Sequence, residues 1–151
     1  MTARCRITTL ELHRCVITGP HLEWLAGGVL VQSQALVHLD LSGNGIGPDG
    51  AESLAGVLAQ CAALAHLDLK SNQIGDPGAE RFAGVLGQCR VLTHLNLSYN
   101  DIGPDGAESF AGVLSRCPAL DHLDLRNNYI GTVGEGRLRA SWRGQASGLV
   151  L

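Results

Sequence analysis

The sequence predicts a repeating α/β fold, in which a short strand, a turn and a helix recur along the chain. Three observations predict it. A long phrase returns at a fixed interval, the phrase alternates apolar and polar residues, and the segment after it has apolar residues at helical spacing. With 151 residues, the chain has the length of one domain, so we expect a single domain spanning residues 1–151.

The repeated phrase begins with a leucine, and successive copies are 28 residues apart. Four copies begin at Leu36, Leu64, Leu92 and Leu120, and they read LVHLDLSGNGIG, LAHLDLKSNQIG, LTHLNLSYNDIG and LDHLDLRNNYIG. A more divergent copy begins at Ile7, 29 residues before Leu36. The predicted repeats therefore cover about residues 7–35, 36–63, 64–91, 92–119 and 120–142, with a divergent C-terminal tail at 137–151.

Each copy indicates a strand followed by a helix. Leu39 and Leu41 alternate with polar residues, which places both leucines on one face of a strand. Apolar residues then recur at the spacing of a helix face, at Ala51, Leu54, Ala55 and Leu58 and at the equivalent places of the next two copies. We expect the helices to begin just after Gly47, Gly75 and Gly103.

Acidic residues stand where the helices are expected to begin. Asp49 with Glu52, and Asp105 with Glu108, have the D-x-x-E spacing of a capping box. Asp76 precedes Pro77, as a capping residue precedes a proline in the first helical turn. The sequence therefore predicts that each of these carboxylates caps its own helix.

The pattern L-x-x-L-x-L-x-x-N/C-x-L with this period resembles the ribonuclease-inhibitor-like class of leucine-rich repeats, which also occurs in NOD-like receptors and Ran GTPase-activating proteins. The resemblance implies a right-handed solenoid, or horseshoe arc, with parallel strands on the concave face and helices on the convex face. It also implies that a column of asparagines bonds the backbone of the turns, with Cys15 in that place in the first copy. The column comprises Asn44, Asn72, Asn100 and Asn128.

Composition and charge exclude several classes of function. The net charge of −3 disfavours nucleic-acid binding, and no apolar run is long enough to span a membrane. The N-terminus lacks the apolar core of a signal peptide, so we expect a cytoplasmic protein with its five cysteines reduced. Three cysteines recur at the helix ends, one per repeat, which favours buried fillers over metal ligands. These are Cys61, Cys89 and Cys117. We predict no cofactor and no resident metal.

The exposed face of the strands carries the candidate site, because strands stacked in register bring equivalent residues into columns. Histidines form one column, acidic and amide side chains the second, and Lys70 and Arg126 belong to the third. Tyr99 adds an aromatic with a polar tip just past its strand. The predicted partner-binding residues are Glu11, His38, Asp40, His66, Asp68, Lys70, His94, Asn96, Tyr99, His122, Asp124 and Arg126.

These columns hold no converging catalytic group, so the sequence predicts a non-enzymatic module that binds a protein or peptide partner through the concave face. One alternative makes the histidine column a pH- or zinc-responsive sensor surface. Another makes the chain a regulatory fragment of a NOD-like receptor or GTPase activator. Self-association through an exposed edge strand is a further possibility, and the apolar end Gly148–Leu151 is a candidate for one more strand or for pairing with such an edge.

Overall fold

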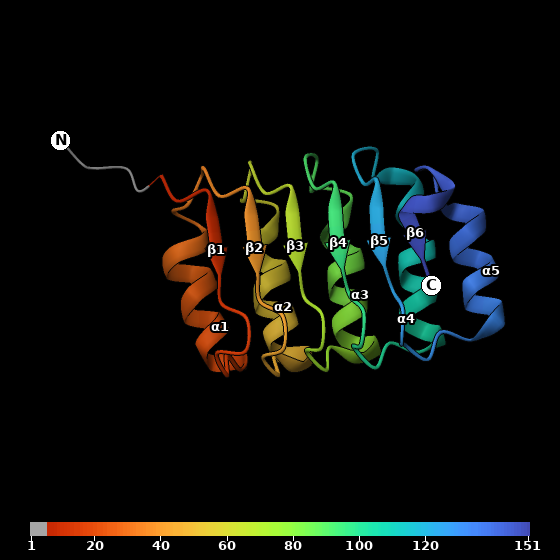
Figure 1. Cartoon of the computed structure of the whole chain (residues 1–151), viewed down its shortest axis with the longest axis horizontal. Helices are drawn as coiled ribbons and strands as arrows, with labels where there is room; N and C mark the ends of the chain where they lie inside the picture. The colour runs from red at the N-terminus through yellow and green to blue at the C-terminus, as the bar shows by residue number, and fades with distance from the viewer. Residues whose placement is uncertain (1–5) are drawn as a thin grey trace.

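The computed structural model describes residues 6–151 as one parallel sheet backed by a row of helices (Figure 1). The six strands lie in chain order, and each is paired in parallel with the next. The predicted leucine-rich-repeat arc is therefore confirmed. The strands are β1 (Thr9–Glu11), β2 (His38–Asp40), β3 (His66–Asp68), β4 (His94–Asn96), β5 (His122–Asp124) and β6 (Leu149–Val150).

The helices all cover the same face of the sheet and run side by side along it (Figure 1). Helices α2, α3 and α4 begin within one residue of the predicted Gly47, Gly75 and Gly103. The α-helices are α1 (Gly19–Leu25), α2 (Gly47–Leu58), α3 (Gly75–Leu86), α4 (Pro104–Ala111) and α5 (Gly131–Ser141). A π-helical turn, η1 (Ala26–Leu30), extends α1, and the 3₁₀ turns η2 (Leu114–Arg116) and η3 (Ala146–Gly148) follow α4 and α5.

The core fills the space between the sheet and the helices. Leu39 and Leu41 are fully buried, as their alternation predicts, and the equivalent leucines of the next three repeats are buried too. Phe82 and Phe110 are the largest fully buried side chains and come from α3 and α4. Because each repeat buries its apolar residues against its neighbours, one continuous cluster runs along the whole described chain.

The asparagine column forms a ladder of hydrogen bonds between adjacent turns. The amide nitrogen of Asn72 donates to the carbonyls of Leu41 (2.9 Å) and Leu69 (3.0 Å). Its amide oxygen accepts from the backbone N–H groups of Asn44 and Gly45, both at 3.1 Å. The same pattern recurs at Asn44, Asn100 and Asn128. The structural role that the family resemblance implies is therefore confirmed.

The predicted capping boxes are wrong. α2 begins at Gly47, so Asp49 is its third residue and makes no capping bond, and Asp105 likewise lies inside α4. Asp76 does cap a helix, but the next one along the chain. Its Oδ1 accepts from the backbone N–H groups of Gly103 (2.7 Å) and Gly106 (2.9 Å) at the start of α4. A Cβ on Gly106 would lie 2.6 Å from that oxygen, so the close approach requires glycine there.

The cysteine column lies in the interior, in agreement with its prediction as filler. Cys61 and Cys117 are buried and Cys89 is half-buried, and each thiol donates to the carbonyl four residues earlier in its own repeat. Burial, and then the nearby thiols of Cys117 and Cys61, raise the pKa of Cys89 to about 11. These cysteines are therefore unreactive thiols at neutral pH. Cys5 lies outside the described residues.

The C-terminal residues add a sixth strand beside β5. Leu149 and Val150 form β6 and pair with Leu123 and Asp124 of β5, which is the first of the two predicted roles for this stub. Trp142 packs against the core, and its indole N–H donates to the carbonyl of Gln145 (2.8 Å). Within residues 6–151, no helix is both long and apolar enough to cross a membrane.

Candidate functional site

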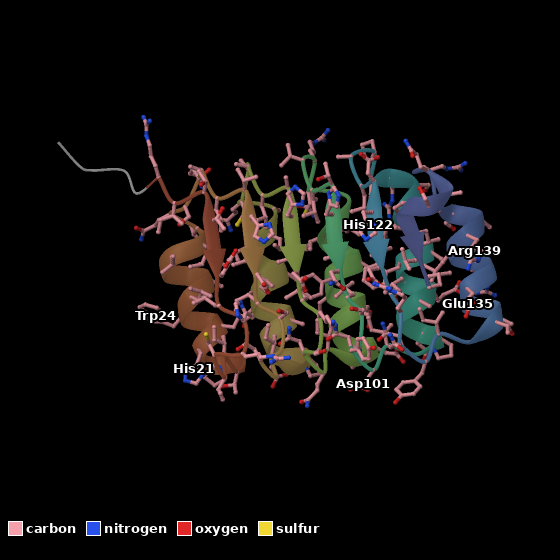
Figure 2. All side chains as sticks on the ribbon, in the orientation of Figure 1. His21, Trp24, Asp101, His122, Glu135 and Arg139 are labelled. Atoms are coloured by element: carbon pink, nitrogen blue, oxygen red, sulfur yellow. The ribbon has the colours of Figure 1, made fainter. Side chains whose placement is uncertain are left out.

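The predicted histidine column is formed by the register of the strands. His38 of β2 pairs with His66 of β3, His66 with His94 of β4, and His94 with His122 of β5. In Figure 2, His122 lies over β5 on the side of the sheet opposite the helices. We name these four residues the histidine file. Thr9 of β1 occupies the first place of the same column.

The rings of the histidine file lie close enough to interact. Ring centroids are 5.7 Å apart from His38 to His66, 4.4 Å from His66 to His94, and 5.6 Å from His94 to His122. The central pair is stacked, with 25° between the ring planes. Burial lowers the pKa of His66 first, and the neighbouring charges of His94 and His38 lower it further. The file therefore resists protonation at its centre.

The second column, two places further along each strand, is occupied by internal hydrogen bonds. An oxygen of Asp40 accepts from the backbone N–H of Ser42 (2.8 Å), and an oxygen of Asp68 accepts from that of Lys70 (2.9 Å). The same bond recurs from Ser98 to Asn96 and from Arg126 to Asp124. These side chains end the strands, because each bonds the backbone two residues on and turns the chain toward the next loop.

Asp124 is the most buried member of the second column, at 3% exposure. Burial by itself raises the pKa of Asp124, but the side-chain and backbone hydrogen bonds from Arg126 outweigh it, so the pKa is lowered. The guanidinium donates from Nε (3.1 Å) and Nη2 (2.6 Å) to the two carboxylate oxygens. The Arg126 side chain stays 58% exposed, so this ion pair holds a cation at the surface in a fixed position.

Lys70 and Tyr99 meet at the turn edge of the sheet. The ammonium of Lys70 lies 5.4 Å from the centroid of the Tyr99 ring, within the range of a cation–π contact. Tyr99 is 52% exposed and has a left-handed backbone with φ 56°, at the position where the second repeat has Gly43. A bulky residue with positive φ is strained, so the fold tolerates Tyr99 at a cost that glycine would avoid.

Two neighbouring residues also belong to this surface, although the predicted set omitted them. His13 brings its Nδ1 to 3.8 Å from an oxygen of Asp40, across the first two repeats. Thr93 brings its hydroxyl to 2.9 Å from Nδ1 of His94. Glu11 of β1 is exposed at the first place of the acidic column. The column pattern includes His13, but no sequence signal pairs Thr93 with the ring that follows it.

One alternative prediction places zinc on the histidine column of the strand face. Among the residues that the structure describes, no group of three or more histidine, cysteine, aspartate or glutamate side chains is placed to hold a metal ion. In the acidic column, oxygens of Asp40 and Asp68 accept backbone and side-chain N–H groups.

Comparison with known proteins agrees with the geometry. The leucine rich repeat family model matches three segments, residues 32–55, 60–83 and 88–111, so the chain carries leucine-rich repeats. Every matched repeat pairs a strand with a helix, as in the ribonuclease-inhibitor-like class. No curated protein sequence matches the chain.

Two solved structures share the fold. The leiomodin-1 actin-binding site 2 structure has a TM-score of 0.74 and 20% identity, over 89% of this chain and 80% of that one. The tropomodulin C-terminal domain of Caenorhabditis elegans has a TM-score of 0.76 and 10% identity, over 89% of this chain and 81% of that one. At such low identity, the likeness establishes a shared fold.

Proposed function

We propose that this chain is a non-enzymatic module that binds a protein or peptide partner through the concave strand face. The observation that carries the proposal is the histidine file, a continuous surface of four rings with adjacent centroids 4.4 to 5.7 Å apart. Lys70, Tyr99 and Arg126 extend this surface at the turn edge. Aromatic and cationic side chains of this kind supply much of the binding energy of protein interfaces.

Actin is the first partner to test. The leiomodin-1 domain is an actin-binding site, and it has the same fold as this chain. Because the two proteins are similar in fold alone, actin is used as a probe whose binding to this chain must be measured directly. Co-sedimentation with filaments and native gel shifts with monomers cover both forms.

The experiment is affinity capture from reduced cell lysate, with purified actin in a parallel sample. The concave variant combines His66→Ala, His94→Ala and Tyr99→Ala, and the convex control combines Glu80→Ala, Gln88→Ala and Ser115→Ala, all exposed positions. We expect the native chain and the convex control to retain the partner and the concave variant to lose it. Equal capture by all three, with circular dichroism showing each folded, would move the binding surface elsewhere.

A second candidate function, a pH-responsive surface, is favoured by the close stacking of His66 and His94. NMR titration of the four ring protons tests it. Four curves that each follow a model peptide would remove this candidate. The regulatory role of a NOD-like receptor or GTPase-activator fragment stays a prediction, to be tested by GTP hydrolysis. Self-association through β1 also stays a prediction, for which sedimentation is the measurement.

A further inference from the structure

The concave face has few free hydrogen-bond acceptors, because three of the four carboxylates in its acidic column are used internally and only Glu11 of the described column is not. Asp68 accepts from Lys70 with one oxygen and from the Asn96 amide (3.0 Å) with the other. Both oxygens of Asp124 accept from Arg126. Asp40 accepts from Ser42 with one oxygen, and the other faces the ring of His13. The acidic column is therefore largely saturated before any partner arrives.

The groups that remain become donors when the rings are protonated, because a neutral imidazole has one donor and one acceptor nitrogen and an imidazolium has two donors. Across residues 6–151, the ring nitrogens of His38, His66 and His122 form no hydrogen bond, while His94 contacts the hydroxyl of Thr93. Lys70 forms no ion pair within the same part of the chain, and its ammonium lies over an aromatic ring instead. A partner that satisfies the protonated surface must bring acceptors, and carboxylates are the acceptors that also gain from positive charge.

The spacing of the file matches a helix better than a strand. Adjacent rings are 4.4 to 5.7 Å apart, and one turn of an α-helix advances about 5.4 Å. Side chains on one face of an extended strand recur about every 6.6 Å. This spacing is larger than that of the rings, so the side chains of a strand would no longer lie opposite the rings after a few residues. Glutamates at successive turns of a helix laid across the strands would each meet one ring.

We propose that the histidine file binds an acidic α-helix of a partner protein, with carboxylates on successive helical turns each facing one histidine. This inference rests on the proposed function, whose surface it shares, and it names the chemistry of the partner. Lys70 and Arg126 then bind further carboxylates at the turn edge, and Tyr99 between them packs against the stems of those side chains.

The proposal carries a pH dependence, because a carboxylate beside each ring favours protonated histidine. At neutral pH the acidic groups on the strands and directly before β5 disfavour an acidic partner. Lys70 and Arg126 offset part of that charge. Protonation of the four histidines adds four positive charges, and the acidic residues on the same strands and directly before β5 are Glu11, Asp40, Asp68, Asp121 and Asp124. An acidic helix should therefore bind more tightly as the pH falls.

The test uses a synthetic helical peptide of about 20 residues, rich in alanine, with glutamate on one face at i, i+4, i+7 and i+11. Its control has glutamine at those places, and a third peptide has the same composition with a central proline that breaks the helix. Fluorescence anisotropy measures binding to the full chain at pH 7.5 and 5.5, where glutamate with an ordinary pKa near 4.3 stays mostly ionised.

We expect the glutamate peptide to bind about tenfold or more tightly at pH 5.5 than at pH 7.5, which corresponds to one histidine pKa raised by about one unit in the complex. The glutamine and proline peptides should bind weakly at both pH values. The His66→Gln/His94→Gln variant should lose the pH dependence, and the convex control should keep it.

Equal binding of the glutamate and glutamine peptides would overturn the proposal, as would equally tight binding of heparin, which would indicate attraction to any polyanion. Equal binding of the proline peptide would overturn the helical part. If lysate capture still depends on the concave face while the acidic helix is ignored, only this inference fails. If the concave variant and the native chain capture the same proteins, the proposed function fails with it.

Discussion

Two columns of identical residues run along this molecule at the same interval, and they differ in what their side chains do. The asparagine ladder lies in the turns, where each amide both donates and accepts between adjacent repeats. The histidine file lies on the concave face, where the rings contact one another and three of the four form no hydrogen bond in the described chain.

This difference teaches how to interpret repetition. A repeated residue whose polar atoms are all used within the fold is repeated because the fold needs it in every layer. A repeated polar residue whose atoms are free leaves its repetition unexplained by folding, and a partner is the next explanation to test. The two columns are therefore distinguished by whether their polar atoms are hydrogen-bonded within the fold. Repetition alone does not distinguish them.

The largest expected loss of stability follows the removal of one asparagine side chain from the ladder. Asn100→Ala removes an amide that donates to Leu69 (2.8 Å) and Ser98 (3.1 Å) and accepts from Asn72 (3.0 Å). Because buried groups left unpaired cost about 1 to 3 kcal/mol each, we expect a loss of about 3 to 5 kcal/mol. Urea unfolding measures it. His94→Ala is the matched control and should change stability by less than about 0.5 kcal/mol.

A similar loss in both variants would contradict the comparison, because it would make the histidine file part of the structure. A small loss in Asn100→Ala would contradict it from the other side. In that case the turns would tolerate unpaired carbonyls and N–H groups, and the accounting of hydrogen bonds would not distinguish the columns.

An intermediate loss of stability is expected from substitution of Asp76. Like the asparagines of the ladder, its side chain bonds the backbone of a neighbouring repeat. Asp76→Ala removes the cap from the backbone N–H groups of Gly103 and Gly106, and caps of this kind contribute about 0.5 to 2 kcal/mol. Asp49→Ala is the control, because Asp49 makes no capping bond. Equal urea midpoints for the two variants would show that Asp76 contributes no more than an ordinary surface carboxylate.

Much of the fold follows from the sequence because the period is long and repeated. The register of Leu39 and Leu67 is fixed once both copies are aligned, and the structure pairs them as predicted. Asp76 shows the limit of the pattern. Its local sequence, Asp before Pro, predicts a cap within its own repeat. In the structure, its carboxylate oxygen instead accepts a hydrogen bond from the helix of the next repeat. Whether it reaches that helix depends on the distance between stacked repeats, which the local sequence does not give.

The columns of the candidate site were predictable from the sequence, but their hydrogen bonds were not. Strand register places the candidate residues in columns, and the structure confirms those columns at His66 and Asp68. The sequence does not reveal that the second column accepts the backbone N–H two residues on, because that bond depends on the turn after the strand. The left-handed backbone of Tyr99 has a sequence signal in Gly43, which stands at the same place two copies earlier.

The glycine column on the convex side extends the comparison to a third set of repeated residues. Gly56 and Gly84 are exposed inside helices, with nothing within 4 Å of an added Cβ, and nothing in the structure explains their repetition. Gly84→Ala should therefore stabilise the chain by about 0.5 to 1 kcal/mol, as alanine does in a helix interior. Thermal unfolding measures the gain. A loss of stability would mean that this face is packed against something in the folded state.

The smallest expected effect is the pH dependence of the free energy of unfolding that arises from the histidine file. The pKa of His66 is lowered from 6.5, by burial first and by His94 and His38 second, so the folded chain binds this proton less tightly than the unfolded chain does. The contribution of neutral His66 to the free energy of unfolding is therefore fully present above about pH 6.5. It is lost as the pH falls through the lower pKa that His66 has in the folded chain.

His66→Gln should therefore reduce the difference in urea midpoint between pH 7.5 and pH 5.5. The double variant His38→Gln/His94→Gln separates the two causes, because it removes the neighbouring charges while His66 stays in place. If burial is the larger cause, this variant keeps most of the pH dependence that His66→Gln removes. If it removes as much as His66→Gln does, repulsion between rings dominates, and the file acts as one coupled group whose protonation at any ring affects the others.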